Sequence, residues 1–511
     1  MKPVKLIVTN KSKLQWKYGK NFSKISAILK QMQAADKKKG LDTRIAFVDD
    51  APSLKSSGIK KISSDSEKEY KRIVDDLYNK YIPAYIVILG AQDIFPFQEI
   101  DNPAEDDDIM IPSDLPYACD TPYSAKIDNF TGPTRVVGRI PDMISQQSDV
   151  SYFQKLISNS IDHKPLNPDE YYNYFAVSAL VWKKSTELSL QSMFGQSAKM
   201  RASPNGKIPK TYVPYTKKEL EPLTHFYNCH GANFDLSYYG QNGQQFPEAL
   251  ESSNIQNKIR PGTIVAAECC YGAQLFDANQ MGFGSAGIAT TYLGNDAIAF
   301  VGSSTIAYGP ADSQGLADLI TQYFIKNILK GASTGRAFLE ARQRFLTEVG
   351  PDLDPIELKT LAQFYLLGDP SVQPAECEEA EILKISVGSA IANTRKNLSM
   401  KGASLGESIG TTKKQKIASP LKAKLLLPDN KTMSVEQILQ NNNFTRADKK
   451  AVYTVKPKST NIIGLQKKFG GKDVRFHTYI QNPMERLKRI RILVVKENAA
   501  EILGWKVYES K

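Results

Sequence analysis

Two short segments of the sequence each end an apolar run with side chains that can react. Residues 226–231 lead to His230, and residues 263–272 lead to the adjacent pair Cys269 and Cys270. A thiolate is a strong nucleophile, and a neighbouring imidazole supports its formation and can protonate a leaving amine. These residue types therefore predict nucleophilic catalysis by a thiol.

Both segments are predicted to be strands whose carboxyl ends meet at one edge of an α/β sheet, where such sheets bind ligands. Gly231 directly follows the histidine and lets the backbone come close to a substrate carbonyl, because glycine has no side chain. The N–H groups of Gly231 and of the nucleophile could then form an oxyanion hole. One such donor contributes about 3–4 kcal/mol to the transition state.

Two other interpretations of these residues remain open. A buried cysteine is commonly an inert apolar residue, and a histidine after a strand is commonly a structural one. A zinc site built from Cys229, His230, Cys269 and Cys270 is disfavoured, because adjacent residues seldom both bind one tetrahedral ion. We therefore expect that a catalytic site here would work without a metal ion, while the structural interpretation of these residues stays open.

The two adjacent cysteines are distinguished by the direction of their side chains. In an extended segment, residues two apart face the same side of the sheet. Glu268 and Cys270 would then share one face, while Cys269 would point into the packing of the sheet. The pattern favours Cys270 as the nucleophile.

The elements that must position these residues are visible in the apolar pattern. Residues 1–380 alternate short apolar runs with amphipathic helices, which predicts an α/β fold with a mostly parallel sheet flanked by helices. The spacing of Ile25, Ile28 and Met32 is helical, and the continuous apolar run at 84–89 is typical of a buried parallel strand. The predicted strands are residues 4–9, 43–48, 84–89, 173–181, 223–228, 263–267, 297–301 and 364–367, and the predicted helices are residues 23–35, 67–80, 315–329 and 333–347.

The charge of the chain is unevenly distributed. The 511 residues include 66 Lys and Arg and 54 Asp and Glu, a net charge of +12. Residues 381–511 hold 26 basic and 10 acidic side chains, a net charge of +16, whereas residues 1–380 carry −4. A nucleic-acid function of the whole chain, which the total would suggest, is therefore disfavoured.

Composition also limits the class of protein. The apolar fraction of 41% excludes a mainly disordered chain. No apolar run approaches the roughly 18–20 residues of a membrane span. Residues 1–13 lack the apolar core of a signal peptide. We therefore expect a cytoplasmic protein without a membrane partner.

Three parts are predicted along the chain. They are an N-terminal α/β subdomain at 1–171, a catalytic subdomain at 172–376 and a small basic β domain at 377–511, with a linker near 399–419. The strands expected in the last part are residues 422–427, 450–456, 474–480, 489–496 and 502–508. Its charge would suit nucleic acid or an acidic protein partner, although it has no nucleic-acid motif.

An acidic loop at 99–114 could bind calcium through its many carboxylates. It lacks the glycine and glutamate spacing of an EF-hand, so a solvated acidic loop is the favoured interpretation. Calcium is the one cofactor that the sequence suggests.

Several motifs, taken together, resemble the gingipain-type family of cysteine peptidases, within the wider group of caspase-like folds. The wider group has one apolar strand ending in His-Gly and a second ending in an acidic or small residue, Ala and Cys, with Cys269 here in the Ala place. Segments at 86–96, 137–141, 301–305 and 367–371 resemble the family in the same order. The resemblance covers roughly residues 1–375.

The resemblance implies a caspase-like catalytic subdomain with His230 as general acid and base and Cys270 as nucleophile. The family also places an acidic residue behind the histidine, on the strand that corresponds to residues 173–181. That strand has no carboxylate here, so no third catalytic residue can be assigned. Asn228 and Ser303 are further candidates for contact with the substrate.

In several caspase-like peptidases an acidic residue two before the cysteine lines the first pocket, and Glu268 holds that place. A buried carboxylate pairs well with Arg or Lys. We therefore expect cleavage of protein or peptide substrates after Arg or Lys. Specificity for Asn is the rival, because legumain-like enzymes also carry Glu there.

The predicted function is thus a cysteine endopeptidase that works through an acyl-enzyme. Such an enzyme could cut itself at Lys183-Lys184 or in the stretch 413–416. The alternative is a catalytically silent, caspase-like interaction protein whose basic C-terminal domain binds nucleic acid or an acidic partner.

Overall fold

The computed structural model describes most of the chain. The described residues are 2–144, 150–205, 213–350, 352–376, 426, 433–455, 474–481, 489–498 and 501–511. The predicted linker at 399–419 and nearly all of the strand expected at 422–427 lie outside them.

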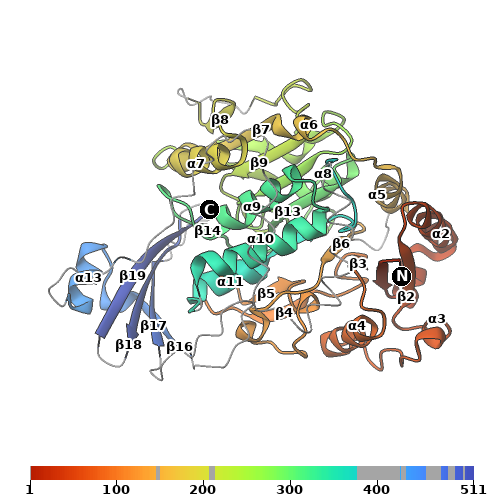
Figure 1. The fold of residues 1–511 in the computed structure, drawn as a ribbon. Helices are drawn as coiled ribbons and strands as arrows, with labels where there is room; N and C mark the ends of the chain where they lie inside the picture. The colour runs from red at the N-terminus through yellow and green to blue at the C-terminus, as the bar shows by residue number, and fades with distance from the viewer. Residues whose placement is uncertain are drawn as a thin grey trace.

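A ten-stranded sheet forms the centre of the molecule (Figure 1). Neighbouring strands are parallel at every pairing except that between β13 and β15, which is antiparallel. In spatial order the strands are β2 (Asp42–Phe47), β1 (Val4–Thr9), β3 (Tyr85–Leu89), β6 (Val137–Ile140), β15 (Phe364–Leu367), β13 (Ala299–Ser303), β12 (Ile264–Ala267), β9 (Thr224–Asn228), β7 (Tyr174–Ala179) and β8 (Met200–Ser203).

The antiparallel pairing divides the sheet into two halves of opposite direction. The carboxyl ends of β7, β9, β12 and β13 consequently lie at one edge, while those of β1, β3 and β6 lie at the other. All residues of β7, β9 and β12 are buried, as expected for strands covered on both faces. The predicted α/β fold with a mostly parallel sheet is confirmed.

Helices cover both faces of this sheet. One apolar core packs α9, α10 and α11 against it, and a second core packs α2, α5 and α8 against the opposite face. The helices are α1 (Lys11–Tyr18), α2 (Phe22–Lys38), α3 (Ala51–Leu54), α4 (Glu67–Tyr81), α5 (Val150–Asp162), α6 (Pro168–Tyr172), α7 (Lys183–Phe194), α8 (Ile288–Gly294), α9 (Ala317–Leu329), α10 (Thr334–Val349) and α11 (Pro355–Gln363).

The predicted helical spacing is confirmed in α2, where Ile25, Ile28 and Met32 are buried. Two short hairpin sheets complete this part of the fold, and their strands are β4 (Gln98–Asp101), β5 (Met110–Ser113), β10 (Ser237–Tyr239) and β11 (Glu248–Glu251). Among the described residues, no helix combines the length and apolar character needed to cross a membrane.

The segments that resemble the peptidase family meet where the two halves of the sheet join. The side chain of Arg139 on β6 is fully buried and pairs with Asp114 at 2.6 Å. The N–H of Gly368 donates to the carbonyl oxygen of Arg139 at 2.6 Å. A side chain at Gly138 would come within 2.9 Å of the Gly368 carbonyl oxygen, so close packing requires glycine there. The residues of these motifs therefore serve the packing of the sheet.

A buried ion cluster joins β1 to the end of β15, and it provides a test of the fold. The ammonium of Lys5 lies 2.5 Å from Asp369 and 3.0 Å from Asp36, with all three side chains buried. Lys5→Met should lower the free energy of unfolding by about 3–5 kcal/mol, because it leaves buried carboxylates uncompensated. Lys11→Met, which removes a more exposed pair with Asp50, should cost less than about 1 kcal/mol. Urea denaturation compares the two, and equal losses would contradict this role of Lys5.

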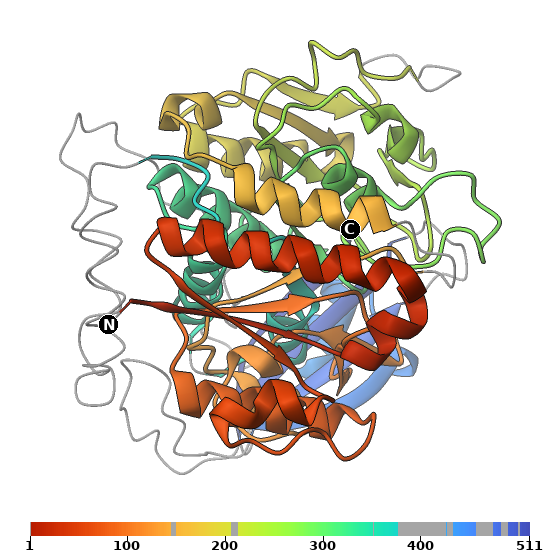
Figure 2. The same cartoon turned by 90° about the vertical axis from the view of Figure 1, so that its right-hand side faces the viewer.

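The C-terminal part forms a second, antiparallel sheet, as predicted. Its strands are β16 (Lys449–Val455), β17 (Val474–Gln481), β18 (Arg491–Asn498) and β19 (Glu501–Ser510), and helix α13 (Val435–Asn441) packs on it. A short strand of the first 376 residues, β14 (Tyr308–Gly309), pairs with the outer edge of β19. The end of β19 therefore reaches the middle of the molecule. The label C stands beside β14 in Figure 1 and again lies within the outline of the molecule in Figure 2.

The predicted boundary at 171/172 falls inside α6, before its last residue, and the strands on either side of it belong to one continuous sheet. That boundary and the one at 376/377 remain predictions.

Candidate active site

The two reactive segments follow neighbouring strands. Strands β9 and β12 pair in parallel, and the N–H of Glu268 continues the ladder by donating to the Tyr227 carbonyl at 2.8 Å. This pairing brings Gly231 against the cysteines. A Cβ atom at Gly231 would lie 1.8 Å from the Cys270 carbonyl oxygen, so no other residue fits without moving the backbone.

The two cysteines point to opposite sides of the sheet, as the alternation predicts. Cys269 is fully buried in the core with Cys229, whereas Cys270 belongs to the core on the other face and is 5% exposed. The sulfur of Cys270 accepts from the N–H of Ala307 at 3.3 Å. Burial raises the pKa of the Cys270 thiol to about 12, so the thiol is protonated in this state.

The turn after Cys270 is held from outside by the acidic loop. Tyr271 has a φ of +52°, which is uncommon for a residue with a side chain. Its hydroxyl donates to Asp108 at 2.7 Å, and the other oxygen of Asp108 accepts from the N–H of Ile306 at 2.9 Å. Asp108 thus fixes both the cysteine turn and the segment that leads into β14.

The calcium prediction concerns the same loop. Asp106 and Asp108 both contact the buried ammonium of Lys359, at 2.5 and 2.6 Å. In the described residues, no group of three or more His, Cys, Asp or Glu side chains is arranged to hold a metal ion. Calcium at 99–114 remains an untested prediction, and these two carboxylates are already neutralised by a lysine.

His230 is held by an amide that the sequence pattern did not reveal. Its Nε2 lies 2.8 Å from Oε1 of Gln241. The amide nitrogen of Gln241 donates to the Gly243 carbonyl at 2.9 Å, which orients the amide so that its oxygen faces the imidazole. Nε2 therefore carries the proton, and Nδ1 is the nitrogen that can accept one.

The rings of Trp182 and Phe246 enclose His230, with centroids 4.3 and 5.2 Å away. Burial lowers the pKa of His230 to about 4. Imidazole and thiol are consequently both neutral in this state. Gln241 follows β10 and does not lie on β7, the strand on which the resemblance would place an acidic partner.

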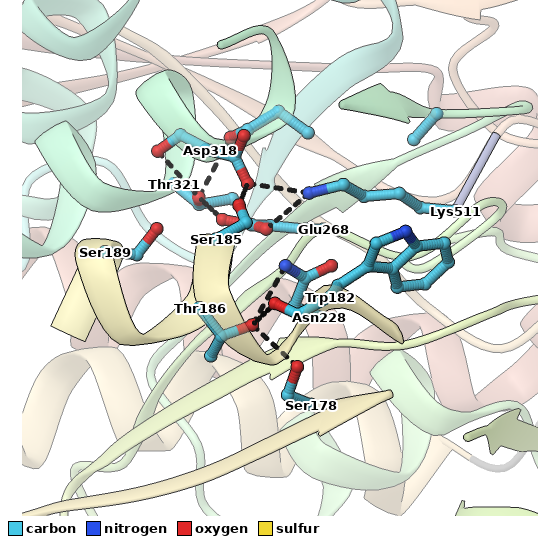
Figure 3. Close-up of polar contacts among 12 residues, drawn as sticks. Ser178, Trp182, Ser185, Thr186, Ser189, Asn228, Glu268, Asp318, Thr321 and Lys511 are labelled. Atoms are coloured by element: carbon cyan, nitrogen blue, oxygen red, sulfur yellow. Dashed lines mark hydrogen bonds and ion pairs between the residues drawn. The ribbon is translucent and has the colours of Figure 1, made fainter. Parts of the chain in front are cut away.

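Glu268 lies in a closed polar pocket that also contains Asp318 and Lys511 (Figure 3). All three side chains are fully buried. The ammonium of Lys511 lies 2.6 Å from Asp318 and 3.0 Å from Glu268. Burial, and then the charge of Asp318, raise the pKa of Glu268. Burial alone would lower the pKa of Lys511, but the two acids outweigh it and raise that pKa, so the ammonium is charged.

Hydroxyl groups complete the pocket. Ser185 donates to Asp318 at 3.0 Å, and Thr321 donates to Glu268 at 2.7 Å. Trp182 forms a wall, with its ring centroid 5.9 Å from the Lys511 ammonium. Gly309 leaves the space for the lysine stem, because a Cβ there would lie 2.3 Å from the Lys511 Cε. The pocket thus holds the long cationic side chain of Lys511, and we call it the cation pocket.

Asp318 was missed by sequence reasoning, although a signal existed. It is the single acidic residue of α9, and it lies in the first turn of a helix that is otherwise mostly apolar. A fully buried carboxylate on such a helix needs a cationic or hydrogen-bonding partner.

Asn228 and Ser303, the other candidate substrate residues, lie on either side of this region. Asn228 is buried beside the pocket, and its amide donates to Thr186 at 3.0 Å (Figure 3). Ser303 donates to the carbonyl oxygens of Cys269 and Thr305, at 2.8 and 3.0 Å. Ser303 therefore holds the main chain beside Cys270, and its predicted contact with the substrate remains a prediction.

The structure does not test the predicted self-cleavage sites. Lys183-Lys184 begins α7, and the stretch 413–416 lies outside the described residues. Self-cleavage at either remains a prediction.

The geometry combines a cysteine, a histidine and a cation pocket at the carboxyl ends of parallel strands. The model of Peptidase family C25 matches residues 3–375. A solved structure named "Structure of Protease" is 12% identical with a TM-score of 0.46, and the match covers 99% of this chain and 96% of that chain. No curated protein matches the sequence. The chain belongs to peptidase family C25, the gingipain family, and is a cysteine peptidase, a hydrolase that acts on protein substrates.

Proposed function

We propose that this peptidase is an endopeptidase that cleaves after Lys or Arg, with Cys270 as nucleophile and His230 as general acid and base. The observation that carries the proposal is the pair of buried carboxylates, Glu268 and Asp318, around an ammonium group beside the nucleophile. Desolvated charge pairs of this kind discriminate strongly against neutral side chains.

The reaction follows from the groups present. Nδ1 of His230 takes the thiol proton, and the Cys270 sulfur attacks the scissile carbonyl carbon. His230 then gives that proton to the leaving amine as the C–N bond breaks, which forms a thioester. A water molecule, deprotonated by His230, hydrolyses the thioester and regenerates the thiol. The N–H of Cys270, with that of Gly231 beside it, would stabilise the oxyanion.

The specificity is tested with peptide substrates that differ only at P1, the residue before the scissile bond. In Glu268→Gln with Asp318→Asn, the ratio of kcat/KM for P1 Lys and Arg to kcat/KM for a neutral P1 residue should fall by roughly 10²–10³-fold, the effect of losing a buried charge partner. Glu187→Gln, at an exposed carboxylate on α7, is the matched control and should match wild type. An unchanged preference for Lys and Arg in the double variant, or a wild-type preference for Asn, would refute this specificity.

The dependence on pH gives a second readout of the same pocket. Because burial and Asp318 raise the pKa of Glu268, binding of a cationic side chain should strengthen as the pH rises through that pKa. Glu268→Gln should remove this dependence for P1 Lys while leaving the remaining pH profile in place.

A further inference from the structure

The last residues of the structure lie in the candidate site as a substrate would. Strand β19 pairs antiparallel with β14, with Ser510 opposite Tyr308. The N–H of Lys511 then donates to the Ala307 carbonyl at 2.9 Å. The carbonyl oxygen of Lys511 accepts from the N–H of Cys270, also at 2.9 Å. Extended peptides commonly bind by adding a strand to a sheet edge in this way.

The position of the Lys511 carbonyl matches the chemistry of the site. Its oxygen lies where an oxyanion would be stabilised, on the N–H of the proposed nucleophile. Its side chain fills the cation pocket (Figure 3). Main chain and side chain together place Lys511 as the P1 residue, with Ser510 and Glu509 as the two residues before it.

We propose that the end of β19 is an intramolecular inhibitor, which keeps Lys511 in the specificity pocket and is anchored there by the C-terminal sheet. This inference rests on the proposed function of the pocket. It assigns β14 as the strand that binds substrate and the C-terminal sheet as the element that regulates access.

The anchoring contacts explain why the segment stays in place. Lys506 of β19 pairs with Glu357 at 2.5 Å, and Lys496 of β18 pairs with Asp352 at 2.8 Å. The hydroxyl of Tyr508 donates to Asp354 at 2.6 Å. Side chains of β17 and β18 share one apolar core with α9 and α10. A substrate must therefore displace a segment tethered to its own enzyme at high effective concentration.

These contacts also account for part of the charge asymmetry of the chain. The basic C-terminal part directs Lys496, Lys506 and Lys511 onto acidic side chains of the catalytic part. One acidic partner of this part is therefore the peptidase itself. The thiol and the imidazole are both buried while Lys511 occupies the site, consistent with their neutral forms in this state.

The test measures access to Cys270 and peptidase activity in four full-length proteins: wild type, Lys511→Met, Lys511→Arg and Lys450→Met. Met keeps the approximate length of Lys without its charge, and Arg keeps the charge. Lys450 is an exposed lysine on β16 of the same sheet, so Lys450→Met is a matched control for the loss of one charge. Access is the rate of iodoacetamide alkylation at Cys270, read by peptide mapping, and activity is kcat/KM for a P1 Lys peptide.

Lys511→Met should accelerate alkylation of Cys270 and raise kcat/KM, each by at least about tenfold, because the apparent rate scales with the fraction of open sites. Lys511→Arg and Lys450→Met should stay within about threefold of wild type. Equal alkylation rates in wild type and Lys511→Met, or equal acceleration in Lys450→Met, would overturn the inhibitor. Faster alkylation without cleavage of any P1 Lys or Arg peptide would support occlusion by Lys511 and refute the proposed specificity instead.

Discussion

Cys270→Ala should lower kcat/KM for P1 Lys and Arg peptides by at least about 10⁴-fold, because the reaction then has no nucleophile to form the thioester. The adjacent Cys269→Ala is the matched control. Cys269 is fully buried in the core on the opposite face of the sheet, so its replacement should cost stability but retain activity within about threefold.

The kcat/KM of both variants should be measured with Lys511 present and again in the Lys511→Met background, where the site is expected to be open. Intact-mass spectrometry with a P1 Lys chloromethyl ketone gives an independent readout, since one label should attach in Cys269→Ala and none in Cys270→Ala. Full activity in Cys270→Ala, or its loss in Cys269→Ala alone, would contradict the assignment.

His230→Ala should lower kcat/KM for an amide substrate by roughly 10³–10⁴-fold. Without the imidazole, no group accepts the thiol proton and no group protonates the leaving amine. A P1 Lys p-nitrophenyl ester, whose leaving group needs no proton, should lose much less. This difference separates a general acid from a residue that only supports the fold. Equal losses for amide and ester would argue against proton donation by His230.

Gln241→Ala should cause a smaller loss than His230→Ala, because it removes only the residue that orients the imidazole. Gln241 holds the imidazole by accepting a hydrogen bond from Nε2. Without this contact the imidazole can adopt the other tautomer and another orientation, so the rate of amide cleavage should fall by about tenfold. The same ester should again be less affected. Gln241→Glu should restore most of the activity, because a carboxylate also accepts from Nε2.

Much of the fold follows from local pattern. The continuous apolar runs and the helical spacing in residues 1–376 predict eight of the ten strands of the central sheet, and the helices α2, α4, α9 and α10, within two or three residues. The antiparallel pairing of β13 with β15 could not be predicted, because nothing in a four-residue apolar run such as β15 encodes its direction. That pairing nevertheless decides which strand ends share an edge with the site.

The candidate site likewise consists of residues that the sequence predicts and of contacts that only the folded chain shows. The sequence by itself was enough to predict His230, Gly231, Cys270 and Glu268 as site residues, because each comes within three residues after a strand. The parallel pairing of β9 and β12 brings these segments together in the folded chain. The tertiary structure alone decided the pocket, in which Lys511 meets Asp318 across 193 residues of chain and Glu268 across 243. Such contacts leave no periodicity in the sequence, since they depend on how a second sheet docks on the first. The basic C-terminal charge was visible at once, but only the folded chain shows that part of it is directed into the cation pocket of the peptidase.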